Sequence, residues 1–225
     1  MRVAAAALVA LALVTRAGAA SPPGPPEAVP DFAILQDGDD LIHHGGEAPL
    51  NPGPGWLALD VVDGLWHLRA ATLRGEQAID PIGEENTGVR IHATPAHAFL
   101  YLKLPTLVPG KVDTPNMRFR DHWRQFVDGQ SLPLAFKGRT WRFDVRKHEV
   151  VLSEGATSIS LGQVVDDSDD TFALRWAGDL DRDGRLDFIF ERGASNSSEI
   201  CIWLSSLAVP GKPIGEAACW LTTGC

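Results

Sequence analysis

Four aspartates lie within nine residues near the C-terminal end of the chain. Asp179, Asp181 and Asp183 alternate with other residues, and Asp187 follows a few positions after Gly184. Calcium takes roughly six to eight oxygen ligands at short range, and alternate carboxylates on a tight turn can converge on one such ion. Magnesium is less suitable, because it keeps several of its own waters. The spacing therefore predicts a calcium site.

The expected ligand set includes one main-chain oxygen. Gly184 permits the sharp reversal of the loop, and the carbonyl of Arg185 supplies an oxygen between the alternate carboxylates and Asp187. The alternative is an acidic β-turn on the surface. Against it, close carboxylates repel one another by about 1 kcal/mol per pair even in water. The sequence-predicted ligands are Asp179, Asp181, Asp183, Arg185 and Asp187.

The segments on both sides of this loop have the alternating pattern of β-strands. Apolar residues occupy every second position from Thr171 to Trp176 before the loop and from Leu186 to Glu191 after it. An EF-hand has a helix on each side and a bidentate Glu at its twelfth position, where this chain has Phe190. The pattern therefore predicts a strand-loop-strand calcium clip that ties two core strands together.

The stretch from Gly178 to Asp187 resembles the calcium loop of FG-GAP or VCBS-type repeats, which are integrin-like. Its order of glycine and aspartate residues matches G-D-x-D-x-D-G-x-x-D at every defined position. In that family the motif recurs once per blade of a β-propeller, whereas this chain has one copy. The resemblance thus implies calcium and adjoining strands, but not a full propeller. Single copies also resemble loops in small secreted bacterial proteins of unknown function that end in a hairpin.

Most of the remaining chain has period-two patterning, with turn residues between the apolar runs. The expected fold class is mainly β: an antiparallel β-sandwich, or two small β units. Expected strands lie at 65–70, 97–104, 140–145, 149–153, 158–165, 171–176, 186–191 and 200–205. Trp66, Trp141 and Trp176 lie in phase with the apolar side of their strands, which favours core packing over binding of sugars.

The N-terminal region has the pattern of an export signal. An early Arg and an apolar run are followed by small residues, and the run is too short to span a bilayer, so 1–20 are expected to be a signal peptide. The proline-rich 21–30 should form an extended tether. A boundary near 112 divides the rest into an N-terminal β unit at 31–112 and a C-terminal β unit at 113–225. The expected location is secreted or periplasmic, with no membrane span.

Charge and cysteines restrict the function classes further. Without the signal, 18 basic residues face 29 acidic ones, a net charge of −11. This balance disfavours nucleic acid as a partner. Cys201, Cys219 and Cys225 predict one disulfide in an oxidising compartment, but their spacing does not select the pair.

No linear catalytic motif or dinucleotide-binding glycine pattern occurs in the sequence. We therefore expect calcium as the cofactor of a binding or cell-envelope interaction module, with an envelope or extracellular protein or glycan as partner. Two alternatives remain open: a secreted hydrolase with dispersed catalytic carboxylates, and a purely structural periplasmic protein. An apolar cleft with two converging carboxylates would favour the hydrolase.

Overall fold

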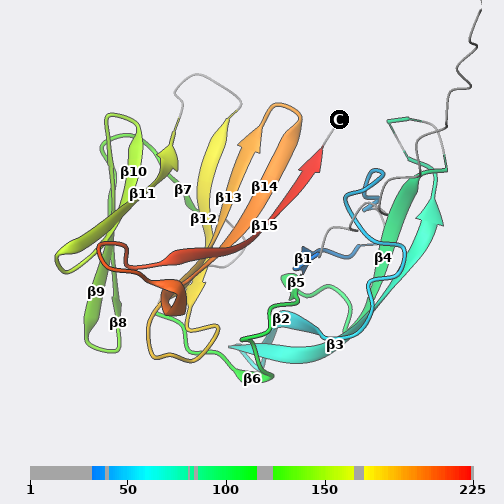
Figure 1. Cartoon of the computed structure of the whole chain (residues 1–225), viewed down its shortest axis with the longest axis horizontal. Coiled ribbons are helices and arrows are strands. Elements are labelled where there is room, and N and C mark those ends of the chain that lie inside the picture. The colour runs from blue at the N-terminus through cyan, green and yellow to red at the C-terminus, as the bar shows by residue number, and fades with distance from the viewer. Residues whose placement is uncertain are drawn as a thin grey trace, which may run out of the picture. The chain divides into compact units, whose positions relative to one another are not determined.

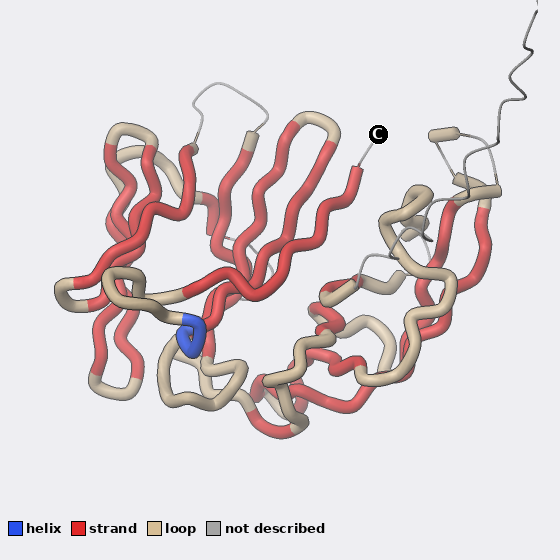
Figure 2. Tube along the Cα trace, in the orientation of Figure 1, coloured by secondary structure: helices blue, strands red, loops and turns tan. Residues whose placement is uncertain are grey.

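The computed structural model describes residues 32–38, 41–80, 82–83, 86–115, 124–164 and 170–223. The expected signal peptide, the expected tether and Cys225 lie outside the described residues. Nearly all regular structure is strand, with a single 3₁₀ turn, η1 (Ser205–Leu207), in the described part of the chain (Figure 2). Among the same residues, no helix reaches the length and apolarity needed to cross a membrane.

The first sheet is built from strands of the first half of the chain. Its strand order is β1-β5-β2-β3-β4, with β6 also pairing with β3, and all pairs are antiparallel. The strands are β1 (Ile34–Leu35), β2 (Trp56–Val62), β3 (Leu65–Ala78), β4 (Gly88–Thr94), β5 (Leu100–Leu102) and β6 (Gly110–Lys111). The fourteen-residue strand β3 pairs with both β2 and β4 along different parts of its length.

The second half of the chain forms two antiparallel meanders (Figure 1). The four-stranded sheet has the order β11-β10-β9-β8, and the five-stranded sheet has the order β15-β14-β13-β12-β7. Their strands are β7 (Arg124–Gln125), β8 (Ser131–Phe136), β9 (Arg139–Arg146), β10 (Glu149–Glu154), β11 (Thr157–Gln163), β12 (Thr171–Gly178), β13 (Asp187–Ala194), β14 (Ser197–Leu204) and β15 (Gly215–Thr223).

Aromatic side chains fill the space between these two meanders. Phe188 on β13 lies 5.3 Å, centroid to centroid, from both Trp141 and Phe143 on β9, in edge-to-face geometry. Phe172 on β12 belongs to the same cluster and packs edge to face against Phe126 at 5.4 Å. Such pairs add to the stability gained from burial alone. The arrangement is a β-sandwich in which β12 and β13 contribute one inner face.

The five-stranded sheet is apolar on its other face as well. Ile189 on β13, Ile200 and Ile202 on β14 and Trp220 on β15 belong to a second core with residues of the first sheet. Both faces of β13 are therefore buried near the aspartate loop, and its first four residues are all buried. A strand buried on both faces shows a continuous apolar run rather than a clean alternation.

Trp176 does not lie on the face that the sequence predicts for it. Phe172 and Leu174 face the sandwich core, whereas Trp176 belongs to the second core and packs edge to face against Trp66 at 5.9 Å. The pairing of β12 with β13 shifts register between Leu174 and Trp176. The extra residue of a β-bulge reverses the facing of the side chains that follow it. The expectation that Trp176 is a core residue is nevertheless correct, because it is fully buried.

The mainly β, antiparallel fold class expected from the sequence is confirmed, and the described strands form open sheets rather than a propeller. The strands of the first sheet end at Lys111, and those of the other two sheets begin at Arg124. Residues Phe32–Cys225 nevertheless cluster as one compact unit. The division at 112 into separate β units stays a prediction.

Strand register selects the disulfide pair that spacing leaves open. Cys201 on β14 lies directly opposite Cys219 on β15, and their sulfur atoms are bonded. The bond links β15, an edge strand of the five-stranded sheet, to its neighbour β14. A disulfide is compatible with the expected export, since such bonds persist in oxidising compartments.

Asp80 organises the turn that follows β3. Its carboxylate is buried, accepts the backbone N–H groups of Ile82 at 2.9 Å and Gly83 at 3.3 Å, and lies 2.6 Å from Nδ1 of His44. The backbone hydrogen bond from Ile82 is the main cause that lowers the pKa of Asp80 to about 2, and the contact with His44 acts in the same direction.

We expect Asp80→Asn to destabilise the protein in a pH-dependent way. Because the folded pKa lies below the unfolded value, the stabilisation by Asp80 is complete above about pH 4 and disappears as the pH falls towards about 2. Urea unfolding at several pH values checks this. The difference between wild type and variant should shrink with acidification, while Asp63→Asn, at an exposed turn position, should show no difference at any pH. A gap that stays constant with pH would mean that the charge of Asp80 contributes nothing.

Candidate metal centre

The aspartate loop joins two central strands of the five-stranded sheet. Gly178 at the end of β12 pairs with Asp187 at the start of β13, and the loop occupies the positions between them. Asp179 and Asp187, at its two ends, are 2% and 0% exposed. Asp181 is half-buried and Asp183 is exposed. The loop therefore places two of its carboxylates inside the protein and two towards its surface.

Carboxylate oxygens hold the backbone of the loop in its tight turn. Asp181 Oδ1 accepts the N–H of Asp183 at 3.2 Å, and Asp183 Oδ1 accepts the N–H of Arg185 at 2.8 Å. Asp179 accepts the N–H of Gly184 with both oxygens, at 3.2 and 3.1 Å. Gly184 has a φ of +85°, a conformation that costs glycine little, so its place in the motif has a backbone reason.

Asp187 is the most constrained carboxylate of the loop. Oδ2 accepts the N–H of Leu180 at 2.7 Å, and Oδ1 accepts the N–H of Ser205 at 2.8 Å and its hydroxyl at 3.1 Å. Burial raises the pKa of Asp187 to about 8, and the nearby charge of Asp181 acts in the same direction, while the backbone donors oppose the shift. The carboxylate is thus well supplied with neutral donors.

Three of the predicted ligands converge. Asp179, Asp181 and Asp187 each offer a carboxylate oxygen, and the three oxygens lie within 4.8 Å of one another. This acidic cluster could hold a metal ion. Asp183 is not part of the converging group; its oxygens accept hydrogen bonds from Arg185 N–H and from the Ser205 hydroxyl at 2.7 Å.

The side chain of Arg185 forms its hydrogen bonds with residues other than the four aspartates of the loop. Its guanidinium bonds to Glu154 at 2.7 Å, to the carbonyl of Ser205 at 3.2 Å and to that of Pro213 at 3.0 Å. It also lies over the ring of Trp141, 5.6 Å from the centroid. These contacts tie the loop to the strands around it and leave the main-chain carbonyl as the atom that the spacing assigns to the ion.

A lysine from another hairpin lies beside the cluster. Lys137, in the turn between β8 and β9, places Nζ 2.8 Å from Asp179 Oδ2 and 3.0 Å from Asp113 Oδ2. The contact with Asp179 is the main cause that raises the pKa of Lys137. Asp113 also accepts the N–H of Asp179 with its main-chain oxygen at 2.9 Å. One cation therefore offsets part of the negative charge at the end of the cluster nearest Asp179.

Two serines that the aspartate spacing does not indicate complete the surroundings of the loop. Ser205 is buried and bonds to both Asp183 and Asp187, and the Ser206 hydroxyl bonds to Asp181. Both belong to η1, which follows β14. They are far from the loop in sequence, and only the pairing of β13 with β14 brings them to it, so no local pattern could have identified them.

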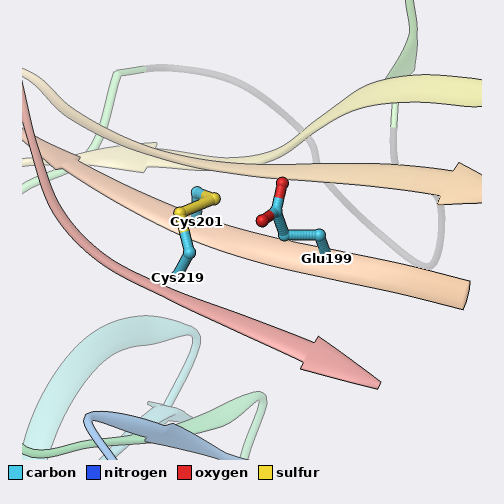
Figure 3. Close-up of side chains that lie close together, drawn as sticks. All are labelled: Glu199, Cys201 and Cys219. Carbon is cyan, nitrogen blue, oxygen red and sulfur yellow. A yellow bond between two sulfur atoms is a disulfide. The ribbon is translucent and has the colours of Figure 1, made fainter. Parts of the chain in front are cut away.

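A second group with ligand atoms close together does not form a metal site in this state. A carboxylate oxygen of Glu199 and the sulfur atoms of Cys201 and Cys219 lie within 4.8 Å of one another, but the two sulfur atoms are joined in the disulfide (Figure 3). The sulfur ligands that bind metals well in proteins are thiolates, which a disulfide does not offer. The aspartate loop is thus the better candidate.

Two carboxylates that line a cavity of about 660 Å³ are paired with arginines. The cavity lies over β9 and β10, and its lining includes Asp144 and Glu154. Glu154 lies 3.0 Å from Arg139, and Asp144 lies 3.9 Å from Arg146. An acid and base pair for hydrolysis needs two environments that push the carboxyl pKa values apart. This arrangement does not favour the hydrolase alternative.

Comparison with known proteins gives no further identification. The chain matches no protein-family model, no curated protein and no solved structure.

Proposed function

We propose that the protein is an exported, calcium-stabilised β module with a binding or cell-envelope interaction role. The observation that carries the proposal is the convergence of Asp179, Asp181 and Asp187 between two core strands. All three ligand atoms are carboxylate oxygens, which suit a hard cation, and calcium accepts flexible coordination by such oxygens whereas magnesium demands a near-ideal octahedron and keeps several waters. The similarity of the loop to FG-GAP and VCBS-type repeats supports the same ion.

The ion in this proposal acts on stability rather than on chemistry. It is held by the three converging carboxylates, with Asp183 and the Arg185 carbonyl completing the ligand set as the spacing predicts. It replaces repulsion between the carboxylates with attraction and ties β12 to β13 and to Ser205, which bonds to Asp187. Export is supported by the signal-like 1–20 and by the disulfide between Cys201 and Cys219.

We expect calcium to raise the melting temperature of the mature protein by about 3 to 6 °C relative to EDTA. Extracellular modules bind calcium with dissociation constants of about 0.1 to 1 mM. With about 1 mM free calcium and a dissociation constant of about 0.1 mM, binding stabilises the folded protein by roughly 1.4 kcal/mol. For a domain of this size, that free energy corresponds to a shift of a few degrees. Thermal melts with calcium, with magnesium and with EDTA measure it.

Substitutions in the loop distinguish calcium binding at this site from a general effect of salt on the melting temperature. Asp181→Asn should abolish the calcium response, since Asp181 is half-buried and belongs to the converging group. Asp183→Asn should weaken the response less, because Asp183 lies outside that group. Asp63→Asn, in an exposed turn outside the loop, should respond like wild type. An equal response in wild type and Asp181→Asn would refute calcium binding at this loop.

A further inference from the structure

A second cavity lies between an early segment of the chain and the end of the five-stranded sheet. It has a volume of about 320 Å³ and is lined by parts of 36–47, by the turn between β13 and β14, and by the last residues of β15. It is distinct from the aspartate loop, because none of Asp179, Asp181, Asp183 and Asp187 belongs to its described lining. Its volume is at the lower end of the range for small-ligand pockets.

The apolar residues that line this cavity are Leu41, Ile42, Ala194 and Trp220, of which Leu41 is 37% exposed and Trp220 is firmly held. Trp220 is 6% exposed and donates its indole N–H to the carbonyl of Glu47 at 2.9 Å. His43 packs against Trp220 with ring centroids 5.3 Å apart, and its ring nitrogen Nε2 lies 3.1 Å from the Gln36 carbonyl. The backbone of His43 pairs with Val89 in both directions at 2.9 Å. The two rings are therefore fixed before any ligand arrives.

The charge of the cavity selects against anions. Glu47 is the only charged side chain among the described lining residues, and burial lowers the pKa of His43, which keeps the imidazole neutral near pH 7. Glu47 is engaged in the protein: Oε2 accepts the N–H of His44 at 2.9 Å, and Oε1 accepts the N–H and hydroxyl of Thr223. A phosphate or carboxylate would find no cation here among the described residues.

The remaining polar groups can both donate and accept hydrogen bonds. The side chains of Gln36, Ser195, Asn196 and Ser197 line the cavity, and none of them bonds to another described residue. Amides and hydroxyls of this kind match a ligand whose own groups also donate and accept. Ser195 and Asn196 form the exposed turn between β13 and β14, whereas Gln36 comes from the early segment of the chain.

We propose that this cavity binds a neutral carbohydrate unit of one or two rings. The apolar face of a sugar ring would lie against Leu41 and the exposed part of Trp220, and its hydroxyls would bond to the uncommitted amides and hydroxyls of the lining. A volume of about 320 Å³ suits such a unit better than an extended chain. The inference rests on the proposed binding role and supplies its ligand class, but it does not require the ion.

The test uses the mature chain and neutral disaccharides as probes: maltose, cellobiose and N,N′-diacetylchitobiose. Ligand-observed NMR and titration calorimetry measure the binding of the free disaccharides at millimolar concentration. A glycan array presents the same disaccharides at the ends of longer glycans, and comparison of the two shows whether the protein recognises the free sugar or the end of a glycan. We expect at least one neutral probe to bind. Asn196→Ala and Gln36→Ala should each weaken its binding several-fold, and Asn51→Ala, an exposed amide outside the cavity, should not.

Three results would overturn the proposal. They are the absence of binding by any neutral probe in solution or on the array, binding that both cavity variants leave unchanged in protein with wild-type melting temperature, and stronger binding of a uronic-acid disaccharide than of any neutral one. The sugar titration is repeated with Asp181→Asn, and the calcium response of each protein is measured separately by thermal melts. Loss of the calcium response with retained sugar binding in this variant supports both proposals as independent of each other, whereas wild-type protein that responds to calcium and binds no sugar refutes only the cavity proposal.

Discussion

Replacing Asp187 by alanine is expected to destabilise the protein by about 4 kcal/mol in EDTA at about pH 4, and by less as the pH rises towards about 8, because burial raises the pKa of Asp187 and makes its ionisation costly in the folded protein. Asp187 is fully buried and accepts the N–H groups of Leu180 and Ser205 and the Ser205 hydroxyl at 2.7 to 3.1 Å. Alanine leaves these donors without an acceptor and creates a small cavity between β12 and β13. Each buried donor without a partner costs about 1 to 3 kcal/mol, so the loss is a large part of the stability of a typical domain.

Urea unfolding measured without calcium isolates this structural role from any bound ion. Asp183→Ala is the matched control in the same loop. Asp183 is exposed and accepts from Arg185 and Ser205, so its removal should cost about 1 kcal/mol. Calcium should not restore Asp187→Ala, because the variant lacks both a ligand and an acceptor. If Asp187→Ala lost no more than Asp183→Ala, the hydrogen bonds of Asp187 would not be what holds the loop.

The difference between these two positions shows what the aspartate pattern alone could not reveal. In the sequence, Asp183 and Asp187 are equivalent members of one motif. In the structure, Asp187 is the first residue of a strand buried on both faces, and its carboxylate has to bond to the backbone around it. Spacing predicted the loop and its strands because both depend on neighbours in sequence. It could not rank the aspartates, because burial depends on the second core.

Long-range contacts account for the other parts of the site that the sequence left out. Lys137 reaches Asp179 from the hairpin between β8 and β9, and Ser205 reaches Asp187 after the full length of β14. The pairing of Cys201 with Cys219 likewise needs the register of β14 on β15. Nothing in the local pattern around these residues indicates their partners. They become neighbours only once the strand order is known.

Strands were predicted where their apolar residues alternate and overlooked where burial or proline hides the alternation. All residues of β2 from Trp56 to Leu59 are buried, so that end of the strand shows no polar face. In β8 the buried residues do alternate, but Pro133 lies in the middle of the strand. Proline is tolerated there because β8 is an edge strand of its sheet, and edge position cannot be read from sequence. The strand β4 was overlooked as well, and β15 was expected only as part of the C-terminal hairpin that the resemblance implies.

Gly178→Ala is the second substitution for which we expect a large effect, a destabilisation of about 3 kcal/mol. A methyl group at this position would overlap the Trp176 indole and lie 3.0 Å from the carbonyl oxygen of Asp113. Neither neighbour can move easily. Trp176 is fully buried and packs against Trp66, and the Asp113 carbonyl accepts the N–H of Asp179. Overpacking of a dense core costs about 1 to 3 kcal/mol, and here backbone and ring resist together.

Gly178 has a packing role that the calcium-loop motif does not reveal. Where the β-bulge turns Trp176 into the second core, its ring covers the glycine two residues further along the strand, and only hydrogen fits beneath it. Gly45→Ala is the matched control, since a methyl group there meets only ordinary contacts with Thr87 at 3.6 Å. Chemical unfolding should show Gly45→Ala within about 0.5 kcal/mol of wild type. A similarly small change for Gly178→Ala would mean that Trp176 can shift, and that the bulge does not fix the entry to the aspartate loop.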